Sequence, residues 1–144
     1  MSQFVITSQQ GAKCIFHSRS YEVGVWLDSY TVELEDLDFR ASARVANPGY
    51  GFPPSVLFTR LASQWAGWRG NEEWRSMEGE FAIVATCDRT GHVKIVFSFP
   101  TPAQSAYWSA SAFVFVEAGQ LESIARDAHA FFNAAPNPSI ERTC

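Results

Sequence analysis

The sequence predicts an α+β protein built mainly from antiparallel strands, and three observations lead to this class. Residues 80–87 and 92–99 alternate apolar and polar side chains on either side of a short connection, Asp88 to Gly91, which is the pattern of a β-hairpin. Segments 54–68 and 119–133 instead carry apolar residues at the spacing of helices. Strands, a helix, more strands and a second helix follow in that order, which is typical of α+β proteins. We therefore expect one antiparallel sheet of about six or seven strands with two helices.

The strand predicted at residues 30–39 contains an irregularity. Its alternation changes phase after Leu34, because Leu37 and Phe39 are apolar where polar residues are expected. One extra residue at Glu35-Asp36 would restore the register, so we expect a β-bulge there. The other strands predicted in this half lie at 4–7, 12–17 and 23–27.

Two helices and a third strand complete the expected fold. A loop rich in Pro and Gly, residues 47–54, precedes the first helix, whose predicted apolar stripe is Leu57, Leu61, Trp65 and Trp68. Residues 113–116 make the strand at 108–117 apolar on both faces, so we place this strand centrally in the sheet. The last helix is predicted to start near Gly119 and to bury Leu121, Ile124, Ala125, Ala128, Phe131 and Phe132.

Length and charge limit the class of protein. The 144 residues fit one domain, which we place at 1–135, with residues 136–144 as a disordered or surface tail. The net charge is −4 and no basic run exists, which argues against a nucleic-acid partner. No apolar run reaches the roughly 18–20 residues that span a bilayer, and the N-terminus lacks the pattern of a signal peptide. We therefore expect a cytoplasmic protein that binds neither nucleic acid nor membrane.

The residues suited to catalysis or metal binding are few and scattered. Three cysteines and three histidines lie far apart, so we expect no disulfide framework, metal site or cofactor. No serine lies in a nucleophile elbow, and we assign no catalytic residue. His92 and Asp88 suit an acid–base pair, but the Asp side chain also suits closure of the turn. The sequence favours a non-enzymatic role and leaves an enzyme open.

Two groups of residues are candidate binding sites. Glu78 and Glu80 are expected to project to the same side, where they act as general acid and base or hold a cation. The pocket predicted around them is lined by Trp65, Trp68, Trp74 and Trp108. The alternative is solvated carboxylates beside tryptophans in the core.

The second group is acidic and comprises Glu33, Glu35, Asp36 and Asp38. Such charges often prevent pairing of an edge strand, and they also attract a basic partner.

Two resemblances add context. Residues 74–79, 88–93 and 117–121, with Trp108 and the predicted helix that ends at residues 65–68, resemble a small uncharacterised bacterial domain family. This family has no established activity, and its members look like immunity or accessory proteins. Residues 137–144 resemble the peptide made when translation runs into the recombination site that ends an integron gene cassette, which implies a bacterial mobile cassette protein.

Together these observations favour a binding or interaction protein, of the immunity type, that turns an acidic face to a basic partner. The alternative is a small-molecule-binding protein or enzyme with the aromatic pocket and paired carboxylates. The high aromatic content and the free edges of the sheet also suggest a homodimer.

Overall fold

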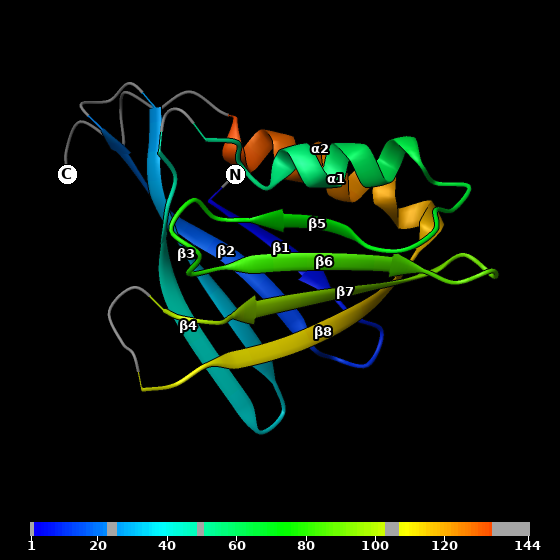
Figure 1. The fold of residues 1–144 in the computed structure, drawn as a ribbon, viewed down its shortest axis with the longest axis horizontal. Helices are drawn as coiled ribbons and strands as arrows, with labels where there is room; N and C mark the ends of the chain where they lie inside the picture. Colours follow the sequence, from blue (N-terminus) through cyan, green and yellow to red (C-terminus); the bar gives the residue numbers. More distant parts are fainter. Residues whose placement is uncertain (1, 23–25, 49–50, 103–106, 134–144) are drawn as a thin grey trace.

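The computed structural model describes residues 2–22, 26–48, 51–102 and 107–133, which form two facing sheets and two helices (Figure 1). Within these residues there are eight strands, arranged as two antiparallel sheets of four. The α+β class is confirmed, but the expectation of one sheet of six or seven strands is wrong. Each half of the chain forms a sheet of its own, because strands pair with their sequence neighbours within each half and β4 does not pair with β5.

The first sheet holds its strands in sequence order: β1 (Gln3–Thr7), β2 (Lys13–Glu22), β3 (Trp26–Asp36) and β4 (Phe39–Ala46). Alternate residues of β3 are buried, as the apolar pattern predicts. The pairing of β2 with β3 is irregular after His17, where Ser18 has a positive φ of 54°. The proposed strand at 23–27 falls partly on residues outside those described, and β3 begins at Trp26.

The change of phase after Leu34 marks a turn, so the predicted bulge at Glu35-Asp36 is wrong. Asp36 pairs with Phe39, and Leu37 and Asp38 form the two-residue connection between β3 and β4. The alternation breaks because the chain reverses here. Leu37 is apolar at a position where turns usually carry Gly, Asn or Asp, which is why the turn escaped the sequence pattern.

The second sheet contains β5 (Glu72–Arg75), β6 (Ala82–Cys87), β7 (His92–Phe99) and β8 (Ala110–Glu117), again in sequence order. The β6–β7 hairpin at residues 88–91 is confirmed, and Gly91 takes the positive φ of 85° that its turn requires. The central position expected for β8 is wrong, because β8 is an edge strand. Its outward side chains Phe113 and Phe115 are 48% and 39% exposed.

Helix α1 (Ser55–Ser63) is shorter than predicted, whereas α2 (Leu121–Phe132) follows a short helical turn, η1 (Ala118–Gln120), close to its expected start. The Ser63 hydroxyl and the Gln64 side-chain amide both donate to the carbonyl of Arg60, which satisfies an acceptor at the end of α1. Trp65 and Trp68 therefore lie beyond the helix. The prediction that Trp65 and Trp68 belong to the apolar stripe of this helix is therefore wrong.

A ring cluster between the sheets and helices forms the core. Phe16 of β2 lies 5.9 Å from Phe81 and 6.4 Å from Phe97, measured between ring centroids, so it joins the first sheet to the second. It also contacts Phe132 of α2 at 5.3 Å. Helices α1 and α2 lie together along one side of the two sheets (Figure 1). The Ser8 hydroxyl accepts the backbone N–H of Phe115, which links the end of β1 to edge strand β8.

Candidate functional site

The acidic residues lie on and beyond the outward face of β3. The register places Glu35 between Lys13 of β2 and Arg40 of β4, and the Lys13 Nζ and Glu35 Oε1 atoms are 3.6 Å apart. Glu33 lies between His17 Nε2 and Arg40 Nη2, with 3.1 Å to each. Cross-strand pairs of opposite charge stabilise a sheet modestly. Two of the four acids therefore face cations of their own sheet.

The other two acids flank the turn between β3 and β4. The Asp36 carboxylate accepts the backbone N–H of Leu37 at 2.7 Å, and both Asp36 and Asp38 are exposed. Leu37 between them exposes 92% of its surface, and Phe39 exposes 39%. An open hollow of about 430 Å³ is lined by Glu35, Asp36, Leu37, Asp38, Phe39 and Arg40. We call Asp36 to Phe39 the hairpin tip.

The charge on Glu33 is stabilised by its neighbours. Partial burial acts to raise the pKa of Glu33, but hydrogen bonds and charges from Arg40 and His17 outweigh it, so the net pKa is lowered. Arg40 in turn has a raised pKa because it bonds Glu33. The base of the hairpin is thus a set of compensated charges, whereas its tip presents acids beside apolar surface.

The first two tryptophans of the predicted pocket follow helix α1. Trp65 is 69% exposed. Trp68 is half-buried, and its indole N–H donates to the carbonyl of Ala85 in β6 at 3.3 Å. A hydrogen bond of this kind satisfies the polar atom of a tryptophan that packs on a sheet.

The other two tryptophans lie at the ends of a row of rings. Trp74 contacts Phe81 at 5.9 Å, Phe81 contacts Phe99 at 5.6 Å, and Phe99 contacts Trp108 at 6.2 Å between centroids. The Trp74 indole N–H donates to the carbonyl of Phe52 at 2.8 Å. Trp74 and Trp108 are thus connected through core phenylalanines, and a ligand-binding role for the four tryptophans stays a prediction.

Glu78 and Glu80 do not project to the same side, so that expectation is wrong. Glu78 is exposed, whereas Glu80 is only 1% exposed. The two residues lie in the turn between β5 and β6, where Ser76 exchanges hydrogen bonds with Phe81 and Gly79 has a φ of 77°. The alternation of a strand does not apply to this turn, and the chain instead directs Glu80 into the interior. Within the described residues, neither oxygen of Glu80 has a hydrogen-bond partner.

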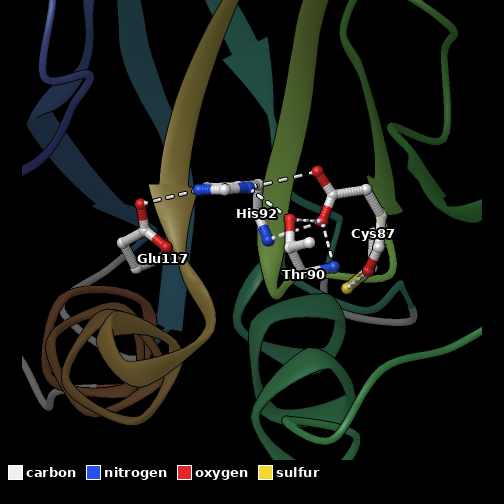
Figure 2. Close-up of polar contacts among 5 residues, drawn as sticks. Cys87, Thr90, His92 and Glu117 are labelled. Atoms are coloured by element: carbon white, nitrogen blue, oxygen red, sulfur yellow. Dashed lines mark hydrogen bonds and ion pairs between the residues drawn. The ribbon is translucent and has the colours of Figure 1, made fainter.

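The β6–β7 turn brings His92 between two carboxylates (Figure 2). Its Nδ1 atom lies 3.2 Å from Asp88 Oδ2 and 2.7 Å from the Thr90 hydroxyl, and its Nε2 atom lies 3.4 Å from Glu117 at the end of β8. Both ring nitrogens therefore have polar neighbours, and the contacts of the ring join the turn to β8.

Asp88 closes the turn as the sequence suggested. One carboxylate oxygen accepts the backbone N–H groups of Thr90 and His92 at 2.8 Å and 3.0 Å and the Thr90 hydroxyl at 2.9 Å. The N–H of His92, the hydroxyl and N–H of Thr90 and the His92 ring together lower the pKa of Asp88 to about 2. The Cys87 thiol donates to the carbonyl of Asp88 on the far side.

Sequence reasoning missed two of these relationships. The pairing of His92 with Glu117 follows from the register of β7 with β8, which places them directly opposite each other. An alignment of these two strands could have revealed it. The burial of Glu80 leaves no such signal, because a Glu beside Gly in a turn normally faces water.

The described residues hold no group of three or more His, Cys, Asp or Glu side chains placed to bind a metal ion. No helix in the described ranges is long and apolar enough to cross a membrane.

The fold and these surfaces define an α+β protein with two facing four-stranded sheets and an exposed acidic hairpin. Residues 5–135 match a family of unknown function designated DUF6228, and the chain belongs to this family. The family match therefore covers nearly the whole chain, whereas the resemblance in the sequence rested on the second half and the helix before it. No curated protein and no solved structure matches the chain.

Proposed function

We propose that this chain is a non-enzymatic interaction protein that binds a basic protein partner through the hairpin tip. The observation that carries the proposal is the 92% exposure of Leu37 in a turn flanked by Asp36 and Asp38. An apolar centre with a charged rim is the usual composition of a protein interface. Carboxylates at the rim attract a basic partner and accelerate the encounter.

The four acids of the predicted acidic face have different parts in this proposal. Glu33 forms an ion pair with Arg40 and Glu35 forms one with Lys13, all in the same sheet. These pairs partly neutralise the two carboxylates, so they attract an external partner less strongly. Asp36 and Asp38 lie at the hollow beside Leu37 and Phe39. These two acids therefore supply most of the attraction, and Leu37 and Phe39 supply the apolar contact.

An immunity-type role is the finer form of the proposal. Immunity proteins act by binding, which requires a recognition surface and no catalytic groups. The resemblance of the tail at 137–144 to a cassette-end peptide supports a mobile bacterial gene. These residues lie outside the described part of the chain, so the support comes from sequence alone.

The small-molecule alternative has less support from the geometry. Trp65 is 69% exposed, and Glu78 and Glu80 occupy different environments, so the burial of these residues gives little support to one shared pocket.

Charge reversal at the hairpin tip tests the proposal. The tagged double variant Asp36→Lys/Asp38→Lys is compared with wild type in capture from a lysate of the host that carries the gene. The matched control, Glu73→Lys/Glu122→Lys, changes the net charge equally at two exposed acids elsewhere. We expect a partner retained by wild type and by the control and lost by the tip variant. Equal retention by both variants would exclude the tip as the binding surface.

A further inference from the structure

The outer face of the second sheet is apolar, which the proposed function does not use. Four apolar side chains lie on this face, between the buried residues of their strands: Val84 of β6, Val96 of β7, and Phe113 and Phe115 of β8. The two valines are partly exposed, and the two rings are 48% and 39% exposed. An antiparallel sheet with one face in water normally carries polar side chains on that face. The outer face of the first sheet follows this rule, because it holds the paired charges around Glu33.

The four apolar side chains form one continuous patch. The register places Val84 directly opposite Val96, and Val96 directly opposite Phe113. The Phe113 and Phe115 rings lie 5.5 Å apart between centroids. The second sheet lies in front of the first in Figure 1, and no helix or strand of the described residues crosses its outer face. A contiguous apolar patch of this kind marks an interaction surface.

The two ends of the patch carry opposite charges. At the β5 end, the exposed Glu73 pairs with Val84 and continues the row Val84, Val96 and Phe113. At the β8 end, the Lys94 Nζ atom lies 4.4 Å from the centroid of the Phe113 ring. Among the described residues, neither Glu73 nor Lys94 has an ion-pair partner. The row is therefore acidic at one end, apolar in the middle and cationic at the other end.

We infer that this face binds the same face of a second copy of the chain, around a two-fold axis parallel to the strands. Such an axis places each end of the row over the opposite end of the row in the other copy. Glu73 of each copy then lies over Phe113 and Lys94 of the other, and the valines meet in the middle. Arg75, the next outward residue of β5, meets the neutral Ser111 of the other copy.

Charge complementarity selects a second copy as the occupant. A face that binds itself must contain both members of every ion pair, and this row contains them at its two ends. An axis across the strands would instead lay each strand over itself, and Glu73 would not reach Lys94. Facing sheets pack about 10 Å apart, a spacing that outward Phe and Val side chains fill.

The inference goes beyond the proposed function, because the hairpin tip belongs to the first sheet. The charge control for the tip, Glu73→Lys/Glu122→Lys, should lose the face contact and still retain the basic partner, so the two proposals fail separately. Self-association depends on concentration, so unfolding measured in dilute solution reports the monomer.

Sedimentation velocity of the whole chain from about 10 µM to about 1 mM tests the contact. We expect the mass of wild type to rise from 16.0 kDa towards twice that value. Lys94→Glu opposes two carboxylates at both ends of the contact, so its dissociation constant should rise at least about 10-fold. Arg126→Glu on α2, an equal change of net charge at an exposed residue, is the matched control and should associate as wild type does. A wild type that stays monomeric throughout, or equal association by Lys94→Glu, would overturn the inference.

A charge exchange tests the orientation of the two copies. Glu73→Lys alone should weaken association as Lys94→Glu does, because two cations then meet. The double variant Glu73→Lys/Lys94→Glu restores opposite charges, so its association should return to within about 3-fold of wild type. Amide chemical shifts in dilute solution confirm that each variant is folded. A folded double variant that associates no better than the single variants would exclude this arrangement.

Discussion

Glu33 of β3 and Arg40 of β4 form a 3.1 Å ion pair across the base of the β3–β4 hairpin. The pair joins two strands that are connected by the two-residue turn Leu37-Asp38. His17 of β2 approaches the same carboxylate. The register thus divides the acidic cluster into a compensated base and an exposed tip. Because the tip is held by paired strands, its acids and Leu37 are presented on a structured support.

The pH dependence of stability should report the Glu33 pair. Since the folded-state pKa of Glu33 is lowered, its contribution is present above its unfolded pKa and is lost as the pH falls through the lowered value. We expect Glu33→Gln to lose about 0.5 kcal/mol at pH 7 and to differ less from wild type well below pH 4. Urea unfolding at both pH values measures this. A deficit that grows on acidification would contradict the assignment.

Asp88 should titrate at low pH. Its pKa of about 2 means that its stabilisation is complete above the ordinary Asp range and is lost between about pH 4 and pH 2. Carboxyl chemical shifts from NMR measure the pKa directly. Asp88→Ala removes the acceptor of two backbone N–H groups, so the amides of Thr90 and His92 should exchange faster. An Asp88 pKa near 4 with unchanged exchange would show that the turn does not depend on this side chain.

Phe16 should be the residue most costly to truncate. Its ring is fully buried and contacts rings of both sheets and of α2. We expect Phe16→Ala to lower the free energy of unfolding by about 3–5 kcal/mol. Phe113→Ala is the matched control, because Phe113 is 48% exposed on β8, and it should cost less than about 1 kcal/mol. Equal losses in chemical denaturation would contradict the described core.

The link between the sheets at Ser8 should be measurable. Ser8 is buried, and its hydroxyl accepts the N–H of Phe115 at 3.1 Å. Ser8→Ala leaves that N–H without its acceptor, so we expect a loss of about 1–3 kcal/mol and faster hydrogen exchange at Phe115. Ser109→Ala, at an exposed serine before β8, should change neither quantity. Slow exchange at Phe115 in the Ser8 variant would mean that another group accepts this N–H.

Local patterns predicted the elements whose side chains alternate regularly. The β6–β7 hairpin was readable because Phe81, Ile83 and Ala85 face the core opposite Val93, Ile95 and Phe97. The turn at Leu37-Asp38 was not readable, since Leu is uncommon in a tight turn and mimics a strand residue there. Edge strand β8 appeared central because its outward Phe113 and Phe115 are apolar.

The candidate sites were harder to predict than the strands, because they depend on how segments that are distant in the sequence lie in the fold. The acidic cluster was visible in the sequence, but the partners of Glu33, His17 of β2 and Arg40 of β4, are placed beside it only by the register of the sheet. Glu80 is buried in the turn before β6, beside Gly79, and no local pattern in the sequence predicts that burial.

The proposed binding surface is tested most directly by locating the interface. The partner retained in the capture experiment is added to the isotope-labelled chain, and hydrogen exchange and amide chemical shifts are measured residue by residue. We predict that the largest changes and new protection fall on the hairpin tip, Asp36 to Phe39, and that the β6–β7 turn is unaffected. Changes centred on residues 88–92 or on Trp65 and Trp108, with an unchanged hairpin tip, would contradict the account.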